Sequence, residues 1–211
     1  MTAVRAMFFD VFGTLVDWRT SVAREAERIL GPIGYKLDWL AFADAWRGEY
    51  QPGMEEVRSG RIPFCKLDVL HRRNLERFIP RFDLRNLSDD ILSELTFVWH
   101  RLDAWPDVPA ALKRLRKKFL LAPVSNGNIS LMVDLARHNE FPWDAILGAE
   151  VAGDYKPKPR VYLAAAAACG LRTGHTARPN EYGPATGEPA PTVKVDVVAK
   201  NLADFADKVG V

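Results

Sequence analysis

The sequence predicts an α/β fold, in which a Rossmann-like core with a parallel sheet carries an inserted helical cap domain. Apolar runs alternate with amphipathic helical patterns, which is typical of parallel strands joined by helices. The strand-like runs are residues 4–9, 119–124, 145–149 and, more weakly, 172–177. The helical patterns between them include residues 108–118 and 129–138.

A long helical region is the second observation behind this prediction. From about Trp18 to Val98 there is no convincing strand-like run, apolar residues recur at helical spacing, and aromatic residues are frequent. We therefore predict a cap domain at residues 17–98 and a core domain formed by residues 1–16 and 99–211. A cap inserted after the first strand would close over a small site at the end of that strand.

The C-terminal part changes character. Residues 174–192 are rich in glycine and proline, so we expect an extended loop there. The chain then resumes with an apolar run at 193–198 and a helical pattern at 202–208.

Composition excludes several classes of protein. The chain has 211 residues and a net charge of +2, which indicates neither a nucleic-acid nor a membrane partner. No apolar run approaches the roughly 18 residues of a membrane span. The two cysteines, Cys65 and Cys169, belong to no motif, and free thiols favour a reducing, cytoplasmic location.

The first strand-like run ends at Asp10, with Gly13 and Thr14 shortly after. Open α/β sheets bind ligands at the carboxyl ends of their strands, and a carboxylate there can act as a nucleophile. The Thr14 hydroxyl could orient that carboxylate. The alternative is a carboxylate that caps a turn, with Thr14 satisfying the backbone.

Short segments in this order along residues 4 to about 165 resemble the haloacid dehalogenase superfamily, and within it the type II L-2-haloacid dehalogenases. The segments are Asp10-Val11-Phe12-Gly13-Thr14-Leu15, Trp46-Arg47, Ser125-Asn126-Gly127-Asn128 and Tyr155-Lys156-Pro157 with Arg160-Val161-Tyr162.

The resemblance implies hydrolytic dehalogenation of short L-2-haloalkanoic acids to D-2-hydroxyalkanoic acids. Asp10 would attack the halogen-bearing carbon and form an ester, Arg47 would receive the halide, and water would then cleave the ester. The implied partner is a small-molecule haloacid, no metal or organic cofactor is required, and a homodimer is compatible with the family.

The resemblance also assigns site residues. The implied catalytic residues are Asp10, Thr14, Arg47, Ser125 and Lys156. The implied substrate-binding residues are Val11, Phe12, Arg47, Ser125, Asn126 and Tyr162.

Physical chemistry supports some of these roles and leaves structural alternatives open. Lys156 would offset the repulsion between a substrate carboxylate and Asp10. Ser125 and free N–H groups at the start of the next helix could bind an anion, or Ser125 could simply cap that helix. Arg47 could equally be a solvated helix residue, Lys156 a surface lysine and Tyr162 a packed aromatic residue. Cap aromatics such as Trp18 could line a halogen pocket.

A magnesium-dependent phosphatase of the same superfamily is an alternative. Phosphatases carry a second aspartate where this chain has Phe12, because an alkoxide leaving group needs a proton and a halide does not. The acidic loop that would hold Mg²⁺ is not found, and no metal ligands are predicted.

The chain departs from the family after Leu163, where a strand, its acidic loop and a helix are expected but not found. In the family, that loop supplies the aspartate thought to activate the water. A further alternative is therefore an impaired enzyme that stalls at the ester. If the strand at 172–177 took the vacant place beside the first strand, Glu181 could face the site and act as the base; its alternative is a solvated loop residue.

Overall fold

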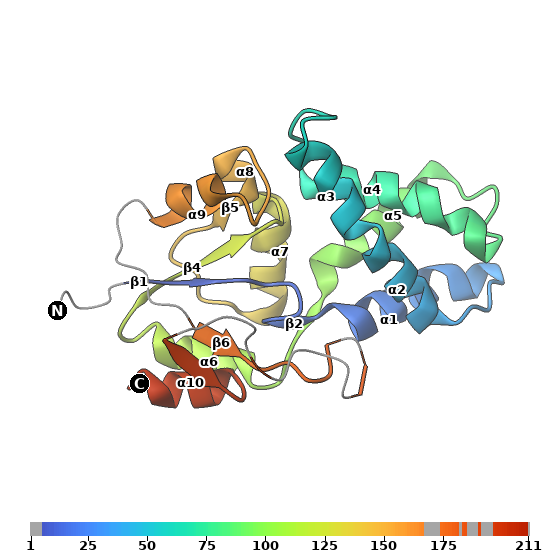
Figure 1. The fold of residues 1–211 in the computed structure, drawn as a ribbon. Coiled ribbons are helices and arrows are strands. Elements are labelled where there is room, and N and C mark those ends of the chain that lie inside the picture. The colour runs from blue at the N-terminus through green and yellow to red at the C-terminus, as the bar shows by residue number, and fades with distance from the viewer. Residues whose placement is uncertain (1–5, 167–173, 182, 185–189, 191–195, 211) are drawn as a thin grey trace.

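The computed structural model describes residues 6–166, 174–181, 183–184, 190 and 196–210. It has the predicted α/β fold: a part with parallel strands and surrounding helices lies beside a part made of helices (Figure 1). The first described strand and the last described helix both lie in the strand-containing part (Figure 1). No described helix is both long enough and apolar enough to pass through a bilayer.

The main sheet has the order β1-β4-β5 and is parallel. Its strands are β1 (Ala6–Phe9), β4 (Leu120–Ser125) and β5 (Leu147–Gly148). Phe9 pairs with Pro123 and Ser125 with Gly148, so the carboxyl ends of β1 and β4 meet at one edge. Gly148 has φ +124°, and a Cβ there would lie 2.2 Å from the carbonyl oxygen of Ser125. Only glycine therefore fits beside the end of β4.

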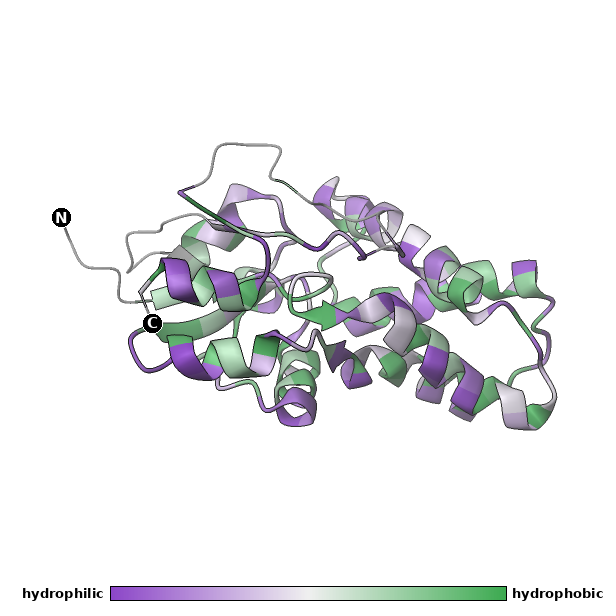
Figure 2. Ribbon diagram, turned by 90° about the horizontal axis from the view of Figure 1, so that it is seen from below, coloured by the Kyte–Doolittle hydropathy of each residue, from purple (hydrophilic) through white to green (hydrophobic). Residues whose placement is uncertain are grey.

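The helices of this part are α6 (Val108–Leu115), α7 (Ile129–Asn139), α8 (Ala149–Ala152), α9 (Pro159–Ala166) and α10 (Leu202–Lys208). Three of them match the helical patterns predicted at 108–118, 129–138 and 202–208, with small changes at the ends of the first two, whereas α8 was not predicted. The strand expected at 145–149 is shorter because α8 begins directly after Gly148. Figure 2 shows hydrophobic residues along the central strands and mixed faces on the helices.

The C-terminal loop prediction was partly wrong. Gly174–Thr176 forms strand β6, which pairs in parallel with β7 (Val197–Ala199). For residues 174–176, the weaker prediction of a strand at 172–177 was therefore better than the prediction of a loop. Residues 172–173 of that strand, and residues 193–195 of the last predicted strand, lie outside the described residues. Strands β6 and β7 form a sheet separate from that of β1, so the alternative in which the strand at 172–177 takes a place beside the first strand is not observed.

Among the described residues, β1 has a strand partner on one side only, β4. Ala6, Met7 and Phe8 are half-buried rather than buried. The family has a further strand after Leu163, and the statement that this chain lacks it stays a prediction.

The helical part begins directly after β2 (Val16–Asp17) and ends just before β3 (Asp103–Ala104). Its elements are α1 (Trp18–Leu30), η1 (Gly31–Ile33), α2 (Trp39–Gly48), α3 (Tyr50–Arg58), α4 (Leu67–Phe78), η2 (Ile79–Phe82), α5 (Asp89–Thr96) and η3 (Phe97–Arg101). Asp17, Asp38 and Ser88 cap α1, α2 and α5 by accepting backbone N–H groups. The antiparallel pair β2–β3 joins the two ends of the insertion.

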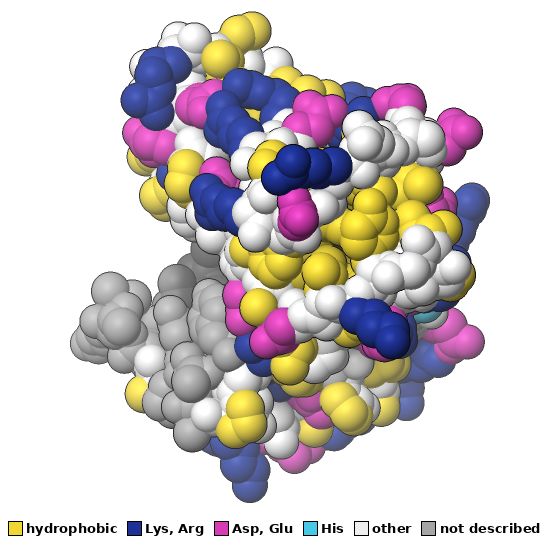
Figure 3. Space-filling view, turned by 90° about the vertical axis from the view of Figure 1, so that its right-hand side faces the viewer, with side chains coloured by type: hydrophobic (Ala, Val, Ile, Leu, Met, Phe, Trp, Pro, Cys, Tyr) yellow, Lys and Arg dark blue, Asp and Glu magenta, His cyan; other side chains and the backbone are white. Residues whose placement is uncertain are grey.

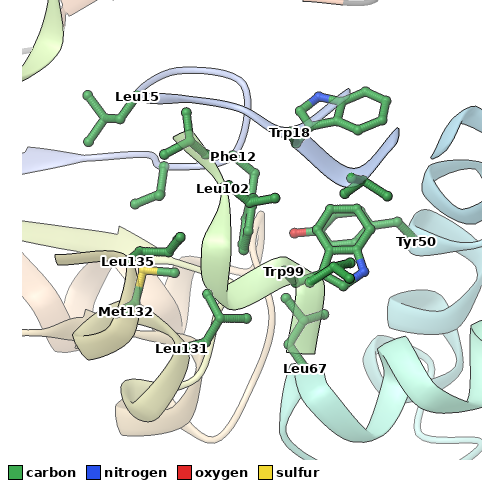
Figure 4. Packing of buried hydrophobic residues seen from close by; sticks show 14 of the residues in the cluster. Phe12, Leu15, Trp18, Tyr50, Leu67, Trp99, Leu102, Leu131, Met132 and Leu135 are labelled. Atoms are coloured by element: carbon green, nitrogen blue, oxygen red, sulfur yellow. The ribbon is translucent and has the colours of Figure 1, made fainter. Parts of the chain in front are cut away.

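One hydrophobic cluster runs through both parts. Where they meet, Phe12 from the loop after β1 contacts Tyr50 and Trp99 edge-on, with ring centroids 6.4 Å and 6.1 Å apart (Figure 4). Trp18 stacks on Trp99 at 6.5 Å. Aromatic packing therefore holds the helices above the end of β1.

The outer end of the helical part exposes apolar side chains between charged ones (Figure 3). Exposed large apolar residues of this part include Ile33, Leu40 and Phe97, which are 50%, 39% and 49% exposed.

Candidate active site

Asp10 lies directly after β1 and is the centre of the site. Its Oδ2 accepts a hydrogen bond from Thr14 Oγ1 at 3.0 Å, and its Oδ1 accepts one from Lys156 Nζ at 2.5 Å. The Asp10 side chain is 43% exposed, so the carboxylate is accessible to a small molecule while both oxygens are held. The structure thus brings together three of the predicted catalytic residues.

These contacts set the charge of the Asp10 carboxylate. Partial desolvation raises its pKa, but the Lys156 ammonium, the Thr14 hydroxyl and the positive charge of Arg47 outweigh that effect and hold the pKa below its usual value. Burial lowers the pKa of Lys156, yet the neighbouring Asp10 charge raises it overall. Asp10 is therefore an anion and Lys156 a cation at neutral pH.

The loop after β1 is fixed by its backbone. Gly13 has φ +85°, which an L side chain rarely adopts, and its N–H donates to the Val16 carbonyl at 3.1 Å. Leu15 N donates to the Val11 carbonyl at 2.9 Å. Val11 and Phe12 in this loop are both buried.

Ser125 and Asn126 follow β4 and are both buried. Ser125 Oγ accepts the N–H of Gly127 at 3.1 Å, which closes a turn. Asn126 Oδ1 accepts the backbone N–H of Lys156 at 2.8 Å, and its Nδ2 donates to the Tyr50 hydroxyl at 3.3 Å. Asn126 therefore links the Lys156 loop to the helical part.

The start of α7 differs from the prediction. The N-cap position belongs to Asn128, so Ser125 does not cap this helix. The N–H of Ile129 donates to Glu150 Oε2 at 2.7 Å. A carboxylate of the chain itself thus takes up this N–H group, which was expected to contribute to an anion site.

The helical part also holds the Lys156 loop. Arg58 Nη1 donates to the Lys156 carbonyl at 2.8 Å, and Lys158 Nζ donates to the Arg58 carbonyl at 2.5 Å. Tyr162 on α9 is 41% exposed, and it contributes to the raised pKa of Lys156. Tyr162 therefore lies at the margin of the site.

Arg47 comes from α2 and lies between aromatic rings. Its guanidinium carbon is 4.1 Å from the centroid of Tyr50 and 5.3 Å from that of Trp18. Within the described part of the chain, its Nη1 is buried and makes no hydrogen bond. A cationic N–H group that is enclosed and lacks a partner is costly, so this arrangement favours an anionic ligand.

Sequence reasoning missed the roles of Tyr50 and Arg58. Tyr50 follows Arg47 by three residues, a separation that brings helical side chains together and could have indicated the contact. Arg58 gives no such signal, because its partner Lys156 is far away along the chain. Glu181 was identified only as an unfavoured alternative.

The described residues provide no cluster of side chains that could bind a metal ion. They contain no group of three or more histidine, cysteine, aspartate or glutamate side chains that could hold an ion. The arrangement instead offers an ionised carboxylate, an ammonium group and an enclosed guanidinium.

Comparison with known proteins agrees with this geometry. A family model described as haloacid dehalogenase-like hydrolase matches residues 4–177. The (S)-2-haloacid dehalogenase 1 of Pseudomonas sp. strain CBS-3 is 29% identical over 165 residues, which make up 77% of this chain and 69% of that protein.

Solved structures extend the similarity to nearly the whole chain. The structure of an L-2-haloacid dehalogenase is 39% identical with a TM-score of 0.91, covering 98% of this chain and 99% of that one. The structure of a defluorinating L-2-haloacid dehalogenase is 36% identical with a TM-score of 0.94, covering 99% and 96%.

Proposed function

Because the chain belongs to the haloacid dehalogenase-like hydrolase family, we propose that it hydrolyses short L-2-haloalkanoic acids to D-2-hydroxyalkanoic acids. The named relatives are (S)- or L-2-haloacid dehalogenases, which favours this activity over a phosphatase or an impaired enzyme.

The enclosed guanidinium of Arg47 is the observation that carries the proposal. A halide leaving group needs a positive partner in a dry site, and it needs no proton. Arg47 offers a buried N–H donor between the rings of Tyr50 and Trp18, and its charge acts on the carboxylate of Asp10. These observations support a pairing of Asp10 as nucleophile with Arg47 as halide acceptor.

In the first step, a carboxylate oxygen of Asp10 forms a bond to C2 of the substrate as the carbon–halogen bond breaks. The electron pair of that bond leaves with the halide, which Arg47 receives. Attack from the side opposite the halogen inverts C2, so an L-substrate gives a D-product. Water then adds to the ester carbonyl, and Asp10 is regenerated as the hydroxy acid leaves.

The remaining predicted residues surround this reaction. Lys156 keeps Asp10 ionised and offsets the substrate's negative charge, and Thr14 holds the second carboxylate oxygen. Ser125 and Asn126 bind the substrate carboxylate or position the loops, while Val11 and Phe12 contribute main-chain groups. Tyr162 is assigned to the margin of the substrate site.

Chloride release from L-2-chloropropionate tests the proposal. Wild-type protein mixed with excess substrate should release one chloride per site rapidly and then continue to turn over, whereas D-2-chloropropionate should release none. Asp10→Asn should abolish both phases. A folded wild-type protein that releases no chloride from the L-substrate would refute the proposed function.

Three further statements remain predictions. Residues 17–98 are proposed as the cap domain and 1–16 with 99–211 as the core domain. A cytoplasmic location is proposed from the cysteine usage. A homodimer is proposed as compatible with the family, and sedimentation or light scattering at several protein concentrations tests it.

A further inference from the structure

An ester on Asp10 is released only if a water molecule is activated close to it. Water is a poor nucleophile at neutral pH, so such a step needs a general base that can take its proton. We infer that Glu181 is this general base, an inference that rests on the proposed function and adds the residue for its second half-reaction.

The carboxylate of Glu181 lies against the nucleophile loop. A Cβ placed on Gly13 would lie 1.9 Å from Glu181 Oε1, 2.3 Å from its Cδ and 3.0 Å from Oε2. The loop is tight, since Thr14, the next residue, hydrogen-bonds to Asp10 itself. Gly13 therefore has no side chain at the point where the Glu181 carboxylate approaches the Asp10 loop.

Three contacts, made by Arg178 and Trp18, hold this segment in place. Arg178 is buried, and its Nε donates to the Thr14 carbonyl at 2.8 Å while its guanidinium forms an ion pair with Asp107 at 3.3 Å. Trp18 Nε1 donates to Glu181 Oε1 at 3.4 Å. Glu181 is thus fixed to the nucleophile loop through Arg178 and to the halide pocket through Trp18.

Other groups near the site are poorly suited to take a proton. Lys156 is a cation paired with Asp10. His71 is buried against Trp99, and burial lowers its pKa to about 3, so its affinity for a proton is low. Ser125 Oγ is engaged by Gly127 N–H. Among the described residues with a contact to the loop from Asp10 to Thr14, Glu181 offers a carboxylate that the first step does not use.

The step balances without any further reactant. Glu181 takes one proton from water while the water oxygen bonds to Cγ of the Asp10 ester. The resulting tetrahedral carbon collapses by breaking its bond to the substrate oxygen, and the proton held by Glu181 passes to that oxygen. The second proton of the water is left on the Asp10 carboxyl group, which releases it to solvent. The products are therefore the 2-hydroxy acid, one proton and the original carboxylates of Asp10 and Glu181.

Glu181→Gln separates this role from a structural one. Glutamine keeps the shape of the side chain and an oxygen that can accept the Trp18 N–H, but it cannot accept a proton. We expect an unchanged burst of one chloride per site from L-2-chloropropionate, followed by turnover reduced about 10²–10⁴-fold. Mass spectrometry of the quenched protein should find the 1-carboxyethyl ester on a peptide that contains Asp10.

Two further variants and the burst in wild type distinguish failure of the role of Glu181 from failure of the proposed function. Glu76→Gln removes an exposed glutamate of α4 and should leave both phases unchanged, and Glu181→Asp should restore part of the turnover. Absence of a burst in wild type would overturn the proposed function. A normal burst with full turnover in Glu181→Gln would overturn the role of Glu181 alone. A wild type that stalls after its burst would overturn both the role of Glu181 and the hydrolysis of the ester in the proposed function.

Discussion

Replacing Arg47 with methionine should separate activity from stability. Methionine has a similar reach and no charge, so it can occupy the space between Tyr50 and Trp18 as an apolar side chain. We expect halide release to fall about 10²–10³-fold, which is the usual loss when one donor to a developing negative charge is removed. The folded protein should nevertheless lose little stability.

The magnitude follows from the contacts of the guanidinium. Its buried Nη1 without a hydrogen bond costs about 1–3 kcal/mol, which the methionine variant recovers. The two ring contacts contribute about 0.5–1 kcal/mol each, which the variant loses. The terms nearly cancel, so the free energy of unfolding should change by no more than about 2 kcal/mol in either direction.

Single-turnover chloride release and urea unfolding measure the two effects. Bromide should raise the unfolding midpoint of wild type and leave Arg47→Met unchanged, because a ligand stabilises only the form that binds it. Arg77→Met, which removes an exposed arginine of α4, is the matched control. The reasoning fails if Arg47→Met releases halide at the wild-type rate, or if bromide stabilises both proteins equally.

Two titration predictions follow from the structure. Lys156→Met removes the main influence that lowers the pKa of Asp10 and leaves the desolvation that raises it. In single-turnover measurements, the pH below which halide release declines should therefore be higher in the variant than in wild type. An unchanged pH dependence would contradict this prediction. Burial lowers the pKa of His100, but Asp68 and Asp134 raise it overall, so its stabilising effect should be full below about pH 6.5 and disappear as pH rises through the raised pKa. The free energies of unfolding of wild type and His100→Gln, measured in urea, should therefore differ by about 1–3 kcal/mol at low pH and converge at high pH. A difference that stays constant with pH would contradict this prediction.

The sequence predicted those parts of the site that lie within short segments. Asp10 and Thr14 are four residues apart and could be placed from an apolar run and a turn. The last helix was predicted with its observed ends, and the structure shows that Asn201 caps it. Local patterns of this kind are visible without knowledge of the rest of the fold.

The parts that could not be predicted depend on contacts between distant segments. Nothing near Glu150 indicates that it takes up the N–H of Ile129, and nothing near Glu181 indicates that it lies against Gly13. The loop expected over 174–192 contains β6, which is stabilised by pairing with β7 rather than by its own composition. Such contacts appear only when the chain is folded.

The contacts between the helical part and the Lys156 loop connect the position of the helices to the charge of the nucleophile. Arg58 binds the Lys156 carbonyl, and Tyr50 binds Asn126, which in turn holds the Lys156 N–H. If the helices moved away from the sheet, both contacts would break and the loop that aims Lys156 at Asp10 would lose its support. Asp10 would then lose part of the interaction that lowers its pKa. Such a movement would thus weaken the nucleophile, and its reversal would restore the support that keeps the carboxylate of Asp10 ionised.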